Sequence, residues 1–371
     1  MEPILLPANQ PPKFYRGGAA IAEFRAGRPA GAAGNDTHTN LETDARRADE
    51  QHPEDWIAST VGQFGAPSAV APGQTVLPDG RLLRDAITAD PLGFLGADHH
   101  ARFGTDPGLL VKLLDAGQRL PVHVHPDRAF AARHLDVRHG KTEAWIVIGT
   151  RDTDAAVYAG FRDPVAPDAV ATWVAQQRTD LMLGALNRID VEPGDTVLIP
   201  AGTPHAIGAG VLLVEIQEPT DFSIMLEWKG FGLPDLDSGQ LGLSQSVALT
   251  CVDHSGWDAD RLATCVTRRA FTGRTGRAGE ASSTESPGRH SLLPHAADEF
   301  FRAEHLGVEG AMDLDPQFAV MVVIDGNARI ECADAALDVR RGHTLLIPYG
   351  AGKTCLTGSA SIVRCMPASV N

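Results

Sequence analysis

Short apolar segments fill the central part of the chain, and each is bounded by Gly, Pro or Asp. Their length and their β-branched content are typical of buried β-strands. Because they follow one another at close spacing, they predict a sandwich or barrel rather than alternating βαβ units. The segments are GLLVKLLDAG at 108–117, LPVHVHP at 120–126, KTEAWIVIG at 141–149, DTVLIPAG at 195–202 and GVLLVEIQE at 210–218.

One helical interruption is predicted among these strands, from Pro167 to Leu186. Val170, Val174 and Leu181 belong to an apolar series that recurs every three to five residues. Pro167 and Asp168 are residue types that favour the first turn of a helix. We therefore expect a small helical insertion in a mainly β protein.

Two segments have the composition of loops. Residues 27–51 are rich in Ala, Gly, Thr, Asn and charge without a sustained apolar period, which predicts a long surface loop. Residues 272–289, TGRTGRAGEASSTESPGR, have the composition of a flexible linker or mobile loop.

A repeat gives the strongest indication of the architecture. The segment GDTVLIPAGTPH at 194–205 recurs as GHTLLIPYGAGK at 342–353, and AWIVIG at 144–149 loosely resembles VMVVIDG at 320–326. A repeat of this kind predicts two tandem β-barrels of one type. We expect a metal-binding unit over 1–260, a linker or mobile loop over 261–290 and a second, metal-free unit over 291–371. The second unit has Lys353 where the first has His205.

Composition narrows the functional classes. The 371 residues include 32 Lys+Arg and 47 Asp+Glu, a formal charge of −15, which disfavours binding to nucleic acid or to anionic membranes. No apolar run approaches the roughly 20 residues needed to span a bilayer, and no secretory signal is visible at the start. We expect a cytoplasmic protein. The five cysteines lack CxxC spacing and are expected to be reduced.

Four residues are candidate metal ligands. His123 and His125 are two apart on a predicted strand, so both imidazoles are expected on one face of it. Glu143 begins the next apolar strand, and His205 closes a Pro-Ala-Gly-x-x-His turn. Three imidazoles and a carboxylate suit Zn²⁺ or another transition-metal ion, with a coordination position left for solvent or substrate.

Each ligand candidate also has a simpler explanation when taken alone. His123 and His125 could form a satisfied structural pair, Glu143 could be a solvated carboxylate at a strand end, and His205 could be a turn residue bonded to the backbone. Together, in the order HxH, E and PxGxxH, they match the two-part cupin signature, and this combination favours the metal site.

Beyond this signature, the chain resembles the class I mannose-6-phosphate isomerases, a branch of the cupins. The resemblance rests on PPKFYRGG at 11–18, PEDWIAS at 53–59, LLVKLLDAGQRLPVHVHPD at 109–127, GKTEAW at 140–145 and PGDTVLIPAGTPHAIGAGVLLVEIQ at 193–217. It implies two jelly-roll barrels and one Zn²⁺ per chain. The implied ligands are His125, Glu143, His205 and His123, which replaces the Gln of the family motif.

The resemblance also implies a reaction, the interconversion of an aldose and a ketose by proton transfer between C1 and C2. Glu215, in LLVEIQE, matches a family carboxylate and is the expected proton-transfer residue; the alternative is a structural ion pair inside the barrel. Lys141 matches the Lys of the family's Gly-Lys-Thr-Glu motif and is expected to bind the sugar or its phosphate. Lys112, inside LLVKLL, is expected to reach a polar cavity and bind substrate, unless it extends to solvent.

One position departs from the family pattern. The segment after the Glu215 strand ends in Met225, where the family has an active-site Arg. A thioether carries no charge for a phosphate or an enediolate. Arg16, Arg188 or Lys229 would have to supply that cation.

Three functions follow from these residues. The first is a Zn-dependent isomerase of carbohydrate metabolism that converts mannose 6-phosphate to fructose 6-phosphate, or a related sugar. The second is a non-catalytic sugar-binding or regulatory cupin. The third is another metal-cupin enzyme such as a dioxygenase, since three His and one Glu also bind Fe or Mn. All three imply a small-molecule ligand, and the sequence leaves the oligomeric state open.

Overall fold

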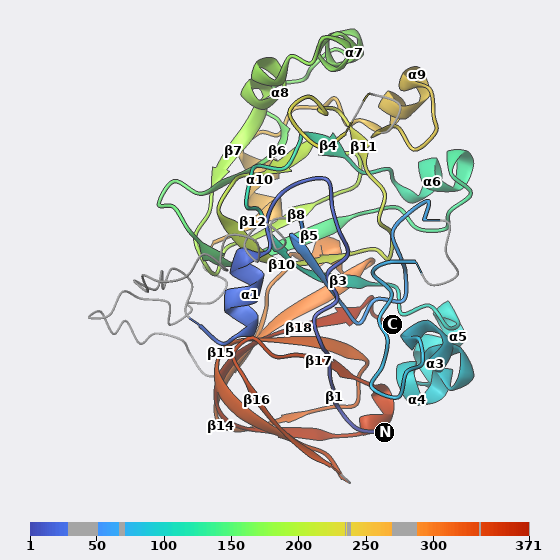
Figure 1. Cartoon of the computed structure of the whole chain (residues 1–371), viewed down its shortest axis with the longest axis vertical. Coiled ribbons are helices and arrows are strands. Elements are labelled where there is room, and N and C mark those ends of the chain that lie inside the picture. Colours follow the sequence, from blue (N-terminus) through green and yellow to red (C-terminus); the bar gives the residue numbers. More distant parts are fainter. Residues whose placement is uncertain are drawn as a thin grey trace, which may run out of the picture.

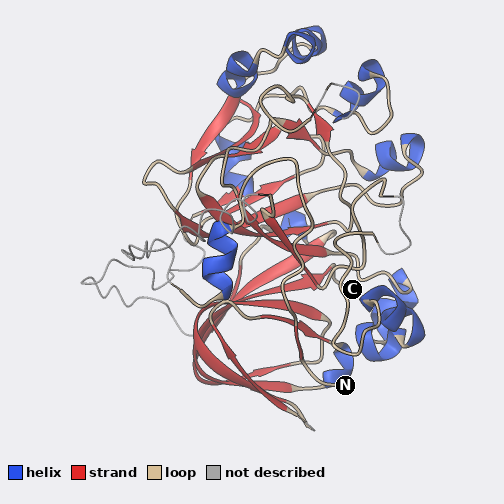
Figure 2. Ribbon diagram, in the orientation of Figure 1, coloured by secondary structure: helices blue, strands red, loops and turns tan. Residues whose placement is uncertain are grey.

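The computed structural model describes residues 1–28, 51–66, 71–233, 235, 239–268, 288–333 and 335–370. Most of the expected loop at 27–51 and most of the expected linker at 272–289 lie outside these ranges. Within them the protein is mainly β, and Figure 2 shows most of the helices above and to the right of the strands, with strands alone at the lower end of the molecule. No described helix is both long enough and apolar enough to cross a lipid bilayer.

The six-stranded sheet lies in the middle of the molecule (Figure 1) and contains four of the five segments that the apolar pattern predicted as strands. Its neighbouring strands pair antiparallel in the order β12, β8, β5, β10, β3, β2. The strands are β12 (Val266–Thr267), β8 (Thr196–Ile199), β5 (Glu143–Thr150), β10 (Val211–Gln217), β3 (Leu110–Asp115) and β2 (Glu54–Ile57).

The five-stranded sheet carries the fifth predicted segment and has the order β11, β4, β9, β6, β7. Its strands are β11 (Ile224–Met225), β4 (His123–Val124), β9 (His205–Ile207), β6 (Ala156–Phe161) and β7 (Leu186–Asp190).

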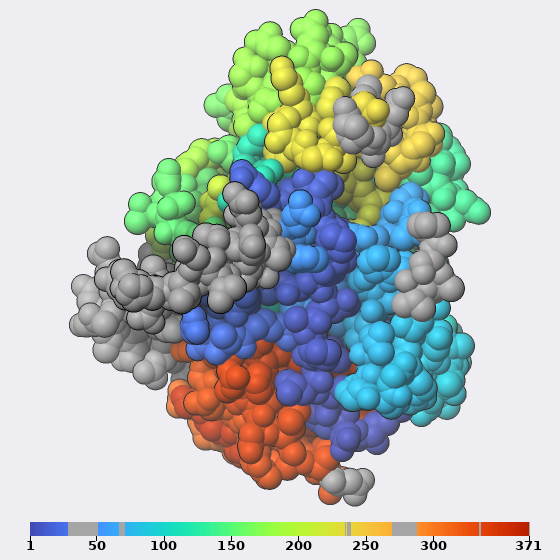
Figure 3. Space-filling view, viewed as in Figure 1, coloured from blue at the N-terminus to red at the C-terminus, as the bar shows by residue number. Residues whose placement is uncertain are grey.

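The seven-stranded sheet is made almost entirely of C-terminal residues. Its order is β1, β17, β15, β18, β14, β13, with β16 pairing to β15. The strands are β1 (Ile4–Leu5), β17 (Thr344–Ile347), β15 (Ala319–Glu331), β18 (Thr354–Pro367), β14 (Phe301–Leu314), β13 (Gly288–Ser291) and β16 (Ala336–Arg340). Since β1 comes from the N-terminus, both ends of the chain meet in this sheet, and Figure 3 shows the N-terminal segment against the C-terminal region.

Alternating side chains on β15 and β17 explain how the sheets pack. Val320, Val322 and Leu346 belong to a core that they share with strands of the six-stranded sheet, such as β3, β5 and β10. Met321 and Leu345, one residue away, belong to a second core within the seven-stranded sheet. The period of two therefore buries both faces of these strands, which accounts for their nearly continuous apolar sequence.

The helical insertion consists of two helices, α7 (Pro167–Gln176) and α8 (Thr179–Ala185). Gln177 separates them with a φ of 51°, so the predicted continuous helix is wrong at this point. Val170 and Val174 of α7 and Met182 of α8 pack into a third core around the five-stranded sheet.

The five cysteines are free, as predicted.

The remaining helices lie around the sheets (Figure 1). They are α1 (Ala19–Arg25), α3 (Leu83–Ala89), α4 (Pro91–Leu95), α5 (Ala97–Phe103), α6 (Arg128–His134), α9 (Gln245–Ala248) and α10 (Ala259–Cys265). Three single 3-10 turns, η2 (Leu249–Cys251), η3 (His295–Ala297) and η4 (Tyr349–Ala351), complete the described structure.

Candidate functional site

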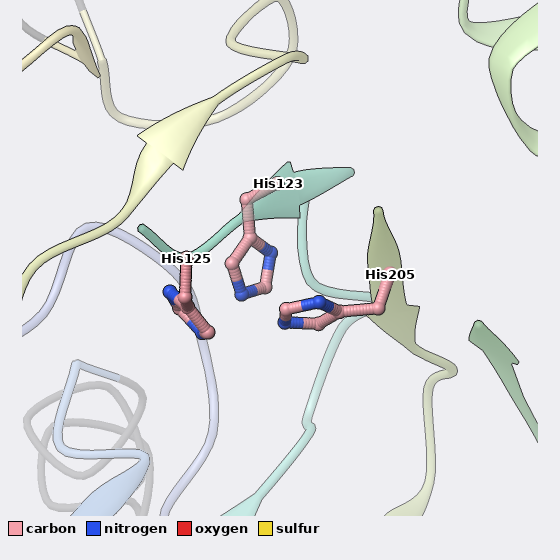
Figure 4. Close-up of side chains that lie close together, drawn as sticks. All are labelled: His123, His125 and His205. Atoms are coloured by element: carbon pink, nitrogen blue, oxygen red, sulfur yellow. The ribbon is translucent and has the colours of Figure 1, made fainter. Parts of the chain in front are cut away.

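Three histidines on or next to strands of the five-stranded sheet converge on one place (Figure 4). His123 on β4 and His205 on β9 are direct antiparallel partners, and His125 follows directly after β4. The ring centroids are 4.1 Å apart for His123 and His205, 4.9 Å for His123 and His125, and 4.7 Å for His125 and His205. Three of their nitrogens, one from each ring, lie within 4.8 Å of one another. The structure therefore brings together the three imidazoles that the sequence analysis proposed as ligands, although the strand that carries His123 is only two residues long.

Backbone carbonyls fix the tautomers of two rings. Nδ1 of His123 donates to Pro121 O at 2.8 Å, and Nδ1 of His205 donates to Thr203 O at 2.7 Å. Because a carbonyl only accepts, each Nδ1 carries the proton and each Nε2 presents a lone pair. The same second-shell bond orients metal-binding histidines in proteins. Nε2 of His205 is buried and has no hydrogen-bond partner among the described residues.

Burial keeps the imidazoles neutral. It lowers the pKa of His123 well below its usual value, and the nearby His205 and His125 lower it further. Burial and then the charge of Lys141 lower the pKa of His125 to about 3. Neutral imidazole is the form that binds a metal ion, so the protonation state suits the ligand role.

Glu143, the first residue of β5, lies against the histidines. Its Oε1 is 3.4 Å from His205 Nε2 and accepts a hydrogen bond from Trp145 Nε1 at 3.0 Å. Its Oε2 is 3.1 Å from both His125 Nε2 and Lys141 Nζ. Burial favours protonation of this carboxyl, but Lys141 and then His125 hold its pKa well below the usual range, so Glu143 is anionic.

A hydrogen bond links the two segments that carry the candidate ligands. The N–H of Gly202, in the turn that precedes the strand with His205, donates to His125 O at 2.7 Å. Gly202 has a φ of +88°, and a Cβ there would lie 3.1 Å from Cys251 O. The left-handed backbone conformation therefore favours glycine at this position, and a side chain would also crowd Cys251 O.

A second charged network adjoins the first. Lys112 on β3 is 2% exposed, and its Nζ lies 3.2 Å from Glu54 Oε2, 3.4 Å from Glu215 Oε1 and 3.6 Å from Asp221 Oδ1. Extension of Lys112 to solvent, the alternative considered from the sequence, is therefore wrong. Glu215 is the direct antiparallel partner of Lys112. Burial and then the charge of Glu143 raise the pKa of Glu215 to about 7.

Sequence reasoning missed five members of this network, which are Lys13, Tyr15, Glu54, Trp56 and Asp221. Lys13 Nζ is 3.0 Å from Asp221 Oδ1 and 3.3 Å from Glu54 Oε2. Trp56 Nε1 donates to Glu54 Oε2 at 2.7 Å, and the Tyr15 hydroxyl donates to Oε1 of the same carboxylate. Lys13 and Glu54 stand in segments that supported the family resemblance, but no local pattern marked them as site residues.

One cavity of about 440 Å³ connects the two networks. Met225, which replaces the expected Arg, also lines it and is the antiparallel partner of His123. The charged or imidazole-bearing residues among its described lining are Lys13, Glu54, Lys112, His123, Lys141, Glu143, Glu215 and Asp221.

These residues fit a divalent metal ion. Three neutral imidazoles, one with an unbonded buried Nε2, and an anionic carboxylate form a donor set typical of catalytic zinc sites. The histidine cluster is the core of this donor set, and Glu143 flanks it.

Comparison with known proteins identifies relatives of this chain. A family model described as "Mannose-6-phosphate isomerase, cupin domain" matches residues 291–367. The mannose-6-phosphate isomerase ManA of Bacillus subtilis is 26% identical over 321 residues, which cover 82% of this chain and 88% of the relative. The mannose-6-phosphate isomerase of Streptococcus mutans is 33% identical over 171 residues, which cover 45% of this chain and 51% of the relative.

Solved structures share the fold. A crystal structure of the mannose 6-phosphate isomerase from Bacillus subtilis aligns with a TM-score of 0.68 at 20% identity, covering 98% of this chain and 99% of that one. A mannose 6-phosphate isomerase bound with zinc and yttrium aligns with a TM-score of 0.69 at 15% identity, covering 100% of both chains.

Proposed function

The chain is a relative of the class I mannose-6-phosphate isomerases of the cupin superfamily, and from this premise we propose that it is a zinc-dependent aldose–ketose isomerase. In the proposed reaction, a mannose-type aldose and the corresponding fructose-type ketose interconvert by proton transfer between C2 and C1. The observation that carries the proposal is the position of Glu215, which lines the same cavity as His123, Glu143 and Lys141.

The proposed metal ligands are His123, His125, Glu143 and His205, with one Zn²⁺ per chain. A Zn²⁺ held by these residues would supply Lewis-acid polarisation of the sugar oxygens at C1 and C2. The hydrogen bonds from Nδ1 of His123 and of His205 to backbone carbonyls hold these two imidazoles in the orientation that a metal ligand needs.

Glu215 is the proposed proton-transfer residue. With a pKa near 7, its carboxylate accepts the C2 proton of the open-chain aldose, which leaves a cis-enediolate. The hydroxyl proton on O2 moves to O1, and the carboxylic acid of Glu215 returns its proton to C1, which gives the ketose and restores the carboxylate. Lys112, 3.4 Å from Glu215 Oε1, holds the carboxylate in place and lies close enough to the cavity to donate to a sugar hydroxyl. Lys141, 2.9 Å from His125 Nε2, is placed to donate to a sugar oxygen beside the metal ligands.

The proposal extends to the domain organisation. We assign a catalytic cupin unit to 1–260 with its helical insertion near 167–186, a linker to 261–290 and a second cupin unit to 291–371, the two units being tandem jelly rolls. The family-model match at 291–367 and the shared strand order of the two large sheets support this assignment. Two strands pair outside the unit to which their residues are assigned. β1 belongs to the proposed first unit but pairs with β17 of the second, and β12 lies in the proposed linker but pairs with β8 of the first.

Replacing Glu215 by Gln tests the function. The amide cannot accept a proton, so ketose formation should fall by about 10²–10⁴-fold, the usual contribution of a general base. Zinc content, measured by elemental analysis on the same preparation, should stay at the parent value. Turnover within a few-fold of the parent would refute the role of Glu215, whereas no turnover by the metal-loaded parent would favour a sugar-binding protein.

A further inference from the structure

We infer that the substrate of this site is an unphosphorylated sugar. The inference rests on the proposed isomerase function and specifies the substrate class that the cavity accepts.

The lysines of the cavity are all engaged with carboxylates. Lys13 lies 3.0 Å from Asp221 and 3.3 Å from Glu54. Lys112 contacts these two carboxylates and Glu215, as described above. Lys141 lies 3.1 Å from Glu143. Three lysines thus face four carboxylates, and a phosphate dianion would have to displace one of these carboxylates or lie beside it.

The described lining also lacks two groups that often bind phosphate in proteins. It contains no Arg, and none of its residues lies in the first turn of an α-helix. Arg16, Arg188 and Lys229, the substitutes considered from the sequence, are not among the described lining residues. Arg16 bonds Gln118 instead, and Arg188 pairs with Asp190. The undescribed residues next to the lining, 67–70 and 236–238, contain no Lys or Arg in their sequence.

Apolar side chains form part of the cavity wall, and one of them, Met225, lies next to a candidate metal ligand. Met225 lies opposite His123 and packs against Gly239, where an added Cβ would be 2.7 Å from the Met225 Cβ. Leu241 and Phe64 also line the cavity. An aromatic and aliphatic wall suits the C–H faces of a sugar ring, while carboxylates and ammonium groups suit its hydroxyls. A neutral sugar makes these contacts without breaking an ion pair.

Two measurements on the zinc-loaded protein test the inference. The first compares kcat/KM for D-mannose and for mannose 6-phosphate by ketose formation. The second compares binding of fructose and of fructose 6-phosphate by titration calorimetry. We expect mannose to be preferred by about tenfold or more, which corresponds to about 1.4 kcal/mol, and fructose to bind more tightly than its phosphate.

Variants of Met225 sharpen the test. Met225→Arg adds a cation to the apolar wall and should shift the preference toward mannose 6-phosphate by about tenfold or more. Met225→Leu keeps the wall apolar, so mannose should remain the preferred substrate. If Met225→Arg does not fold, Asp221→Asn removes a carboxylate from Lys13 and should shift the preference in the same direction.

The outcomes separate the two proposals. Preference of the parent protein for mannose 6-phosphate overturns the inference and leaves the isomerase function standing. Binding of fructose but not of fructose 6-phosphate, without turnover of either aldose, supports the inference and refutes the isomerase function. Absence of both turnover and binding for all four sugars refutes both.

Discussion

In the six-stranded sheet β5 lies between β8 and β10, and in the seven-stranded sheet β15 lies between β17 and β18. The strand orders of the two sheets can be matched position by position. The order in the six-stranded sheet is β12, β8, β5, β10, β3, β2, and the order in the seven-stranded sheet is β1, β17, β15, β18, β14, β13. The repeated glycines agree as well, since Gly194 has a φ of 97° and Gly342 a φ of 86°. Five of these six matched strand pairs also follow the same chain order, whereas β12 comes last along the chain in its sheet and β1 comes first in the other, and β16 has no counterpart. The positions at which the matched strands differ show which residues carry chemistry.

Register identifies the positions that differ. Glu143 pairs with Ile199, and in the second sheet Ala319 pairs with Ile347, the residue at the same place in the repeated motif. The candidate ligand Glu143 is thus matched by a methyl group. Buried His205 is matched by Lys353, which is exposed. Two of the four candidate ligands, Glu143 and His205, therefore have no metal-binding counterpart at the matched positions.

The buried ion pair has a counterpart with its charges reversed. Glu215 pairs with Trp145 on one side and Lys112 on the other, and Arg364 pairs with Met321 and Glu304 in the same arrangement. Arg364 Nη1 donates to Glu304 Oε1 at 2.9 Å. A cross-strand ion pair at this position is therefore not by itself a catalytic feature, and what distinguishes Glu215 is the adjoining cavity.

In the second copy of the repeated motif, the segment that corresponds to 200–205 is 348–353, and it contacts the N-terminal part of the chain. There η4 packs against α4, and a Cβ at Gly96 would lie 2.7 Å from the Tyr349 ring. The N-terminal ammonium of Met1 donates to Gly350 O at 3.3 Å. The second copy of the motif thus binds the N-terminal region of the chain.

The largest expected effect comes from exchanging the residues that distinguish the two motifs. His205→Lys places an ammonium where a lone pair is needed, so zinc affinity should fall by about 100-fold or more. Metal analysis after dialysis against a weak chelator measures it. Lys353→His is the matched control and should leave the stoichiometry at the parent value, because Ala319 offers no ligand atom. Equal zinc retention by His205→Lys would contradict the ligand assignment.

The shared core predicts that the two large sheets unfold together. Leu346→Ala creates a cavity in that core and should cost about 2–5 kcal/mol. All five tryptophans lie at or before Trp257, so fluorescence reports the first unit and far-UV circular dichroism reports both. In urea, both signals should shift to the same lower midpoint. A shift in circular dichroism with unchanged fluorescence would show that the sheets unfold independently.

The reversed ion pair predicts a smaller effect on stability alone. Glu304→Gln leaves the guanidinium of Arg364, which is 2% exposed, without its carboxylate partner. The free energy of unfolding should drop by about 1–3 kcal/mol in urea titrations. Ketose formation should be unchanged, in contrast to Glu215→Gln, since Glu304 does not line the cavity. A comparable loss of turnover in both variants would remove the distinction between the two pairs.

The smallest expected effect concerns pH. Burial opposes protonation of His139, but hydrogen bonds to Asp106 and Glu218 raise its pKa from 6.5 to about 9. This stabilisation is complete below pH 6.5 and is lost as the pH rises to about 9; allowing for screening, it amounts to about 1–2 kcal/mol. His305 in the second unit acts oppositely, because burial lowers its pKa to about 4 and stability falls as the pH drops below 6.5.

Replacing His139 separates the two histidines. His139→Gln should flatten the stability profile between pH 6.5 and 9, as measured by urea midpoints across that range, to which His305 with its pKa of about 4 does not contribute. An alkaline limb identical to that of the parent protein would exclude His139 as its source.

The sequence by itself determined the strands, the three histidines and the repeat. These features are local: period-two alternation defines a strand from its own residues, and the turn from Pro200 to His205 places an imidazole through its own glycine and prolines. The same locality explains why Glu143, at the start of a strand, was recognised together with His123 and His125.

Only the tertiary structure decided the surroundings of that site. Lys13, Glu54, Lys112 and Asp221 meet across as many as 208 residues of chain, a separation over which no periodic pattern links two side chains. Strand register placed Lys112 beside Glu215 and Met225 beside His123, and a shift of one residue would have turned each to the opposite face. The break at Gln177 and the contact of η4 with α4 likewise depend on packing between distant segments. The charge balance of the cavity, and with it the class of substrate, therefore arises from packing and register.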